Sequence, residues 1–576
     1  MPGFFSLEGA KQALGVTAAI EQGLSEREEA VQASQTSATR LLWEQEAETR
    51  WAKLDHLLYL PVLGLTRPRD LYYYQGQGLA VLYGFTYKYL TAEHFLGRLS
   101  RLEVGPPLAA ALAQAYTQAW YPGHHPLVLY VDWHVKPHWT KERSHSGAVT
   151  MWGRVMPGTK QLLVNGPGGQ PLLGWDKPID SHLSGVLVEL EAELARLLAR
   201  PIAYTIFDSE GGGLPLGQRY AAANRPYLSH LPRQDYRLSD FEPLGEWQPV
   251  NHDPQREVAL ARWQDPLKAK AEVRDLVLMR RVGQTDPTRI YTGHLPAELK
   301  LAEIPGSYRR RWSKQERVIR ELVNGANLNA NFGYTYQNVP NRTIQRHWAE
   351  AQERVESSER QLAQHHQAGR NLRQKLRDLD HGYRSQYHSL RQTLLPGQTD
   401  FLTRQARGQP WRRCQQRLAQ IYTRLDQLTQ RYHHHRHKLL TQLQQRGQQL
   451  AQTQAELTQR RQVRDALDTA SLCRERNLEK DQVMLNLQLL LANLHHWARA
   501  HFFAPAWQHL ELKTATELIY RKAGWVEWGQ EAIEVLLEPY RYPEQQQAME
   551  ETCRRFNAAN LCWRDGRRLL IQVAPP

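Results

Sequence analysis

The sequence predicts a multi-domain α+β protein, and three observations lead to that prediction. The chain has 576 residues, and because one domain takes about 100–200 residues, roughly three or four domains are expected. Two apolar runs with β-branched and aromatic residues, at positions 127–131 and 202–207, indicate buried strands. From about position 342 to 468 the composition changes to Gln, Arg, Glu and His, with leucines at helical spacing, which is typical of long paired helices.

Composition narrows the classes of function. Four cysteines form no CxxC pair, so neither a disulfide framework nor a cysteine-built zinc site is expected. No apolar run reaches the roughly 18–20 residues that cross a bilayer, and the first residues lack a signal-peptide pattern, so we expect no membrane partner. The net charge of +14 favours a polyanionic partner, with nucleic acid as the first candidate.

Residues 1–125 are predicted to form an N-terminal helical domain. Positions 26–60 have a polar helical pattern that Pro61 is expected to end, and aromatic and aliphatic residues recur at helical spacing between positions 71 and 121. This domain is a candidate DNA-binding region, although positions 7–28 match a helix-turn-helix only faintly. DNA contacts are also expected in the later parts of the chain.

Residues 126–340 are predicted to form an α/β domain. A first strand ends at Asp132, and positions 147–156 and 160–166 are expected to form a hairpin that turns at Pro157-Gly158-Thr159. A helix follows, with Asp180 or Ser181 as its cap. Its apolar stripe is Leu183, Val186, Leu187, Leu190, Leu194 and Leu197. The next buried strand ends at Asp208, before a flexible turn at positions 209–213.

This order of strand, hairpin, helix and strand is the opening of a ribonuclease-H-like fold. In such a sheet the first and fourth strands are parallel neighbours, so Asp132 and Asp208 are expected to meet at their carboxyl ends, where open α/β sheets bind ligands. Positions from about 214 to 285 suggest a β-rich insertion, followed by the last core strand. A helix from Tyr308 is predicted to end at Gly325.

Residues 341–470 are predicted to form a long helical hairpin that resembles a coiled coil. One apolar seam runs along each helix, and the turn is expected at Leu395-Pro396-Gly397-Gln398. The first seam contains Leu362, Leu372, Leu376, Leu379 and Tyr383, and the second contains Leu418, Ile421, Leu425, Leu428, Tyr432 and Leu439. Residues 471–576 are expected to form an apolar helix and a small α/β region with two strands around a helix.

The strand-end aspartates suggest a metal site. An ionised carboxylate beside an apolar strand is costly unless it is paired or binds a metal, so Asp132 and Asp208 are candidate ligands. A third carboxylate would complete a site for Mg²⁺, which prefers oxygen ligands. Glu303, Glu316 and Glu321 compete for that place, and helical periodicity does not choose among them.

Three stretches resemble the acidic motifs of bacterial insertion-sequence transposases of the DDE class, which have a ribonuclease-H-like catalytic domain. They are LYVDWHVKPHW at 129–139, YTIFDSEGGG at 204–213 and YRRRWSKQERVIREL at 308–322. In such relatives an Arg-Trp pair and then a Gln-Glu pair introduce the third carboxylate, so the resemblance favours Glu316, with Glu321 as the alternative. Here the segment between Trp312 and Glu316 is one residue longer than in some relatives, and one helical position corresponds to a rotation of about 100°.

The resemblance implies a DNA transposase in which Asp132, Asp208 and Glu316 are catalytic and hold Mg²⁺, for which Mn²⁺ would substitute. Its partner would be double-stranded DNA, at the element's ends and at the target, bound by a homodimer in the bacterial cytoplasm at the nucleoid. A non-catalytic DNA-binding scaffold and a structure-specific nuclease of the same fold are the alternatives.

Four further residues are candidate DNA contacts. Tyr308, Arg311 and Arg320 could bind phosphates, or the arginines could be plain surface charge. His134, with His138 nearby, could contact phosphate or a metal-bound water, or could be a polar residue at a strand exit.

Overall fold

The computed structural model describes residues 2–32, 47–74, 89–140, 144–198, 200–211, 216, 219–220, 222–231, 241–264, 273–295, 299–333 and 335–576. These residues form a mixed α/β protein of two compact units. The first unit contains Met1–Asn338 and Arg474–Pro576, and the second contains Val339–Cys473. Positions 33–46 of the predicted N-terminal helix, positions 75–88 of the next helical stretch and positions 212–213 of the Gly-rich turn lie outside the described residues.

A large mixed sheet forms the centre of the first unit. Its described strands are β1 (Leu127–Pro137), β2 (Ser146–Val149), β3 (Arg154–Asn165), β4 (Pro171–Pro178), β5 (Ile202–Phe207), β6 (Tyr227–His230), β7 (Phe241–Pro243), β8 (Gln248–Val250), β9 (Asp253–Gln264), β10 (Val273–Arg281) and β11 (Arg289–His294). Along the sheet the order is β2-β3-β1-β5-β6-β11-β10-β9-β7, with β4 beside β3 and β8 beside β9. The predicted parallel pairing of the first strand with the strand at 202–207 is confirmed, since β1 and β5 are parallel neighbours.

Two expectations about this sheet are wrong. Pro157-Gly158-Thr159 is not a turn, because β3 runs through it and pairs with the end of β1. The chain reverses instead at Gly153 and near Gly169, whose positive φ angles of 59° and 93° suit glycine. The first strand also does not end at Asp132, because β1 continues to Pro137. The strands at 241–281 lie within the range predicted as a β-rich insertion, and β9 and β10 pair through β11 onto β6 and so extend the same sheet.

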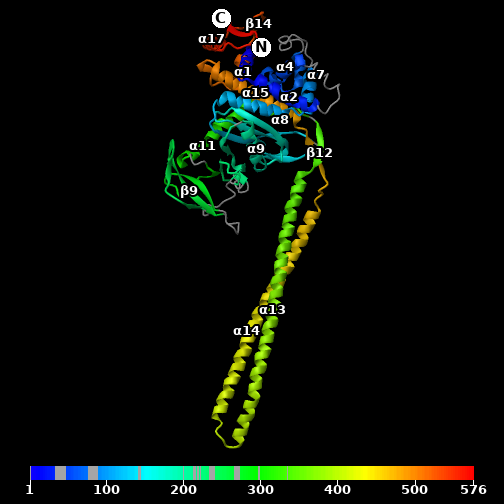
Figure 1. The fold of residues 1–576 in the computed structure, drawn as a ribbon, viewed down its shortest axis with the longest axis vertical. Helices are drawn as coiled ribbons and strands as arrows, with labels where there is room; N and C mark the ends of the chain where they lie inside the picture. The colour runs from blue at the N-terminus through cyan, green and yellow to red at the C-terminus, as the bar shows by residue number, and fades with distance from the viewer. Residues whose placement is uncertain are drawn as a thin grey trace. The chain divides into compact units, whose positions relative to one another are not determined.

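Helices cover the sheet and join distant parts of the chain. The described helices of this unit are α1 (Phe5–Ala13), α2 (Val16–Gln32), α4 (Ala47–Leu58), α5 (Leu60–Leu63), α7 (Tyr89–Arg101), α8 (Gly105–Trp120), α9 (Leu183–Leu197), α11 (Ile304–Arg311), α12 (Arg317–Gly325), α15 (Glu479–His501), α16 (Leu512–Ala515) and α17 (Pro543–Ala558). Both α8 and α15 pack on β4 and on each other (Figure 1). Asn493 of α15 ties them together, because it accepts from Trp120 and donates to the Pro171 carbonyl.

The helix boundaries match the predictions only in part. α9 begins at Leu183 with His182 as its N-cap, so the predicted cap at Asp180 or Ser181 is wrong. As predicted, α12 ends at Gly325. Pro61, which was expected to end a helix, instead lies in the first turn of α5, where its missing N–H is not needed. At the other end of the chain, β14 (Gly524–Trp528), β15 (Ala532–Leu537) and β16 (Arg568–Val573) form a small sheet beside α17. The N-terminal turn Pro2–Phe4 packs on β14 and β15, so the two chain termini lie close together (Figure 1).

The second unit is a helical hairpin of α13 (Arg342–Ala406) and α14 (Arg412–Asp465). The predicted antiparallel pairing is confirmed by contacts such as the stacked rings of Tyr383 and Tyr432, whose centroids are 4.0 Å apart. The expected turn at Pro396 is wrong, because α13 continues through it to Ala406. A Cβ on Gly397 would lie 3.2 Å from Leu418, so this close helix–helix packing favours continuation over the local effect of proline. The turn instead contains Gly408, at a φ of 64°.

Short strands lie where the chain passes between the units: β12 (Tyr336–Pro340) and β13 (Leu472–Arg476) pair with each other. Within the described part of the chain, no helix combines the length and the apolar character that a membrane crossing requires.

Candidate active site

The two motif aspartates lie next to each other because of strand register. Val131 of β1 pairs with Phe207 of the parallel strand β5. Asp132 is the next residue within β1, and Asp208 directly follows the last residue of β5, so their backbones are neighbours where β5 ends. The strands themselves are held by burial, since Val131, Ile206 and Phe207 are fully covered. The apolar runs in the sequence therefore place two carboxylates side by side although 76 positions separate them.

A single arginine joins these aspartates to Glu316. Arg311 Nη1 lies 2.8 Å from Asp132 Oδ2, and Arg311 Nη2 lies 3.0 Å from Glu316 Oε1 and 3.8 Å from Asp208 Oδ1. The arginine side chain is 13% exposed. Three carboxylates from distant segments thus converge on one guanidinium, which neutralises part of their mutual repulsion.

Glu316 reaches this cluster because the helix contains a π-helical turn. Residues Trp312–Glu316 form that turn between α11 and α12, and the Arg317 amide donates to the Trp312 carbonyl five residues back. In a regular α-helix, residues five positions apart point about 140° apart. The wider turn holds one more residue than an α-turn, so Arg311 and Glu316 can face each other.

Strand β3 supports the π-helical turn. The buried side chain of Asn165 donates to the Lys314 carbonyl at 2.8 Å, and the buried Gln315 amide lies 3.4 Å from the Leu163 carbonyl. A π-turn leaves carbonyls without their usual α-helical partner, so these side-chain contacts compensate for the irregularity. The turn is therefore fixed by tertiary contacts with the sheet rather than by local preference.

Asp208 is oriented by its own surroundings. Its Oδ1 accepts from the Ser209 amide at 2.7 Å and from the Tyr308 hydroxyl at 3.3 Å. His230, at the end of β6, places Nε2 3.6 Å from the same oxygen. The sequence reasoning did not single out His230; its place at the end of a strand beside β5 is the signal that could have found it. Asp208 stays open to solvent, with its side chain 43% exposed.

Asp132 has an unusual protonation equilibrium. Burial raises its pKa, Arg311 lowers it, and the charges of Asp208 and Glu316 raise it, while the Trp133 amide lowers it, with a net rise to about 7. Asp132 is therefore poised between its two forms near neutral pH. An added cation would favour the ionised carboxylate, because opposite charge stabilises it.

Glu321, the alternative third acid, lies in a different environment. Its carboxylate accepts from the Leu512 amide at 3.0 Å, and His496 and His495 of α15 lie 3.0 Å and 3.4 Å away. Burial alone would raise its pKa, but the charge of His496 and hydrogen bonds from both histidines outweigh burial and lower it. Glu321 thus joins α12 to α15. Glu303 is at the N-cap of α11, the opposite end of that helix from Arg311.

The other predicted contacts divide into two groups. Tyr308 and Arg311 are brought to the carboxylates, although Tyr308 is only 5% exposed and burial raises its pKa. Arg320 and His134 are not brought to them. Arg320 is exposed and lies 3.7 Å from Glu511. His134 is 8% exposed and its Nε2 lies 2.7 Å from Asn329 Oδ1, so it is held inside the fold rather than presented to a DNA backbone.

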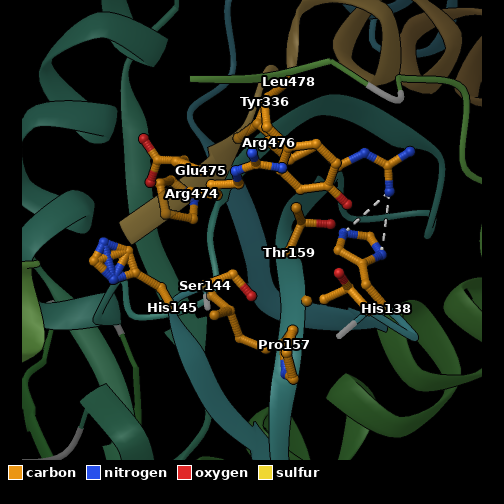
Figure 2. A pocket seen from close by; sticks show the side chains of 14 residues that line it. His138, Ser144, His145, Pro157, Thr159, Tyr336, Arg474, Glu475, Arg476 and Leu478 are labelled. Atoms are coloured by element: carbon orange, nitrogen blue, oxygen red, sulfur yellow. Dashed lines mark hydrogen bonds between the residues drawn. The ribbon is translucent and has the colours of Figure 1, made fainter. Parts of the chain in front are cut away.

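His138 lies away from the acids, in a small pocket of the first unit (Figure 2). The pocket has a volume of about 30 Å³, enough for one or two waters. Arg476 Nη1 donates to the imidazole of His138, as the dashed lines in Figure 2 show, at 3.2 Å from Nδ1 and 3.3 Å from Nε2. Burial, Arg476 and Lys136 lower the pKa of His138 to about 3. His138 is therefore a neutral acceptor that helps to position Arg476.

This arrangement predicts a loss of stability in mild acid. The unfolded chain protonates His138 near pH 6.5 while the folded chain resists protonation down to about pH 3, so the unfolding free energy falls by about 1.4 kcal/mol per pH unit below 6.5. Denaturant titrations at neutral and mildly acidic pH should show a shallower fall in His138→Gln than in wild type. The exposed His509→Gln variant is the control. Equal pH dependence in all three proteins would contradict the assignment.

Comparisons with known proteins assign no family. No family model matches the sequence, and no curated protein matches it. Among solved structures, a piggyBac transposase in a synaptic complex with hairpin DNA, determined by cryo-EM, is similar at a TM-score of 0.31 and 10% identity. That match covers 55% of this chain and 68% of the transposase chain. A TM-score this low assigns neither a fold nor an activity to the protein.

Proposed function

We propose that this protein is a DNA transposase of the DDE class, with a ribonuclease-H-like catalytic region in which Asp132, Asp208 and Glu316 form the active site. The observation that carries the proposal is the convergence of these three carboxylates on Arg311, from three separate segments of the chain. Each segment is one of the stretches that resemble the family's acidic motifs. A structural ion pair would need only one carboxylate beside Arg311, whereas three carboxylates surround it here.

The donor set suits a hard divalent cation. All three side chains offer carboxylate oxygens, which Mg²⁺ prefers and which Mn²⁺ also accepts. Among the described residues, no three such side chains are yet close enough to hold an ion directly, because the guanidinium of Arg311 lies between them. Asp132, Asp208 and Glu316 would hold the cation once Arg311 withdraws. Bound there, Mg²⁺ would activate the attacking oxygen and stabilise the leaving oxygen of a phosphodiester.

The chain's own residues have separate roles in this proposal. Asp132, with its pKa near 7 in the metal-free protein, must lose its proton for the site to carry its full negative charge. Tyr308 and the Ser209 amide fix the orientation of Asp208. Arg311 keeps the acids together without metal and, once displaced, is available for a DNA phosphate. The reaction would be hydrolysis at the element's end, which frees a 3′-hydroxyl, followed by attack of that hydroxyl on target DNA.

The test is cleavage of duplex DNA carrying the ends of the element, with Mg²⁺ or with EDTA. Asp132→Asn and Asp208→Asn are expected to lower metal-dependent nicking by about 1,000-fold or more, because several kcal/mol of transition-state stabilisation are lost. Asp286→Asn, at an exposed turn, is the control. Binding without any cleavage by wild type would favour a scaffold, and cleavage without strand transfer would favour a nuclease.

A further inference from the structure

The positive charge of this protein is concentrated in one segment. The whole chain has a net charge of +14. Residues 360–446, the distal part of the α13/α14 hairpin, contain 17 Lys and Arg but only 4 Asp and no Glu, a net charge of +13. The rest of the chain is therefore almost neutral. Residues 1–125, the candidate DNA-binding region, have 10 basic and 12 acidic residues.

Basic residues form one stripe along each helix of this distal segment. They recur every seven residues and all of them are exposed. On α13 they are Arg370, Arg377, Arg384 and Arg391, and on α14 they are Arg417, Arg424, Arg431 and Lys438. A seven-residue repeat keeps side chains on one line along a coiled coil. The apolar seam, marked by the stacked Tyr383 and Tyr432, faces the other helix, and the stripes lie outside it.

Acidic residues within the segment cannot neutralise this charge. The segment has four aspartates for 17 basic residues. Two of these aspartates lie beside an arginine: Asp400 pairs with Arg404 at 2.9 Å, and Asp380 lies 3.9 Å from Arg436. Exposed pairs of this kind also contribute little stability. The charge thus has no folding role that would account for it, and it fits a partner of opposite sign.

The chemistry of the surface favours duplex DNA over other anionic partners. A second copy of the segment is disfavoured as a partner, because two segments with a net charge of +13 each repel one another. A membrane surface requires an apolar face on the helix. The exposed large apolar side chains of this segment are Leu395, Leu402, Tyr422 and Leu440, too few along two long helices to form such a face. The stripes are almost entirely arginine, which suits phosphate. From Arg412 to Arg446, α14 extends for about 50 Å, the length of about 15 base pairs.

We propose that residues 360–446 of the hairpin bind the phosphate backbone of duplex DNA without reading its sequence. The proposal adds a DNA-binding surface to the proposed transposase. It rests on the proposed function in one respect, which is that the anionic partner is DNA. Removing one stripe should weaken binding on every DNA sequence and reduce its dependence on salt, because fewer counterions are released.

The experiment uses the full-length protein, a labelled duplex of about 30 base pairs and EDTA, so that catalysis plays no part. One variant carries Arg370→Gln, Arg377→Gln, Arg384→Gln and Arg391→Gln; a second carries Arg417→Gln, Arg424→Gln, Arg431→Gln and Lys438→Gln. The matched control is Arg196→Gln, Arg281→Gln, Arg541→Gln and Arg554→Gln, four exposed arginines of the first unit. Glutamine keeps helix propensity close to that of arginine, and circular dichroism would verify that the helices remain.

Each stripe variant is expected to bind at least about 10-fold more weakly than wild type in moderate salt, with the slope of log K against log salt smaller by about 3. The control should change binding by less than about 3-fold. If the stripe variants bind DNA as tightly as the control, the proposal is overturned. Residues 360–446 would then have another anionic partner, such as an acidic protein. The binding assay contains no metal, so its outcome does not depend on the cleavage result for Asp132→Asn. The proposed DNA-binding surface and the proposed catalytic function can therefore fail independently.

Discussion

Glu316→Gln is expected to abolish metal-dependent DNA cleavage, by about 1,000-fold or more, while the protein stays folded. The change removes one negative charge from the set of three acids around Arg311, and a neutral amide is a poor ligand for Mg²⁺. Glu316 is one-third exposed, so the ion pair it loses is worth no more than about 1 kcal/mol of stability. Single-turnover cleavage and denaturant titration together measure both quantities.

Glu321→Gln is the matched comparison, and the opposite result is expected. Its carboxylate is buried between His495, His496 and the Leu512 amide, so removing the charge should lower the unfolding free energy by about 3 kcal/mol. At a temperature where the variant is folded, cleavage should stay within about 10-fold of wild type, since no metal ligand is lost. If Glu321→Gln is folded but inactive while Glu316→Gln still cuts, the third acid has been assigned to the wrong residue.

Asp481→Asn is expected to cause the largest loss of stability, about 3–5 kcal/mol. Asp481 of α15 lies 2.8 Å from Lys136 Nζ of β1, and both side chains are almost completely buried. Its oxygens also accept from the Phe332 and Gly333 amides, and Arg476 lies 3.6 Å away. Burial alone would raise the pKa of Asp481, but Lys136 and Arg476 outweigh it and lower it. The variant leaves two buried cations without this compensating charge.

Equilibrium unfolding in denaturant at neutral pH would measure this loss, with Asp565→Asn as the control. Asp565 pairs with Arg567 at 2.6 Å on the surface, and exposed pairs contribute at most about 1 kcal/mol. A second variant, Lys136→Met with Asp481→Leu, should recover part of the lost stability, since well-packed apolar residues often replace a buried ion pair at little cost. Equal unfolding free energies for Asp481→Asn and Asp565→Asn would contradict the role given to this ion pair.

Regular local patterns made much of the architecture predictable. The apolar runs before Asp132 and Asp208 indicated buried parallel strands, and those strands are neighbours in the structure. The leucine stripe from position 183 marks α9, and the heptads after position 342 mark the hairpin. These patterns are readable because burial of one face repeats with the period of the element itself. The mid-chain turns were misplaced, since Pro157 and Pro396 tolerate a strand and a helix when neighbouring elements pack on them.

The sequence by itself determined which acids are candidates, which segments form the two buried strands beside Asp132 and Asp208, and where the excess positive charge lies. Only the tertiary structure decided that Glu316 faces Arg311 while Glu321 points to α15. The cause is the π-helical turn, which contacts with Asn165 and Leu163 of β3 hold in place. A one-residue change in helical register rotates the following side chains by about 100°. The contacts that hold this register come from residues about 150 positions away in the chain. No periodicity within residues 308–325 could have revealed it.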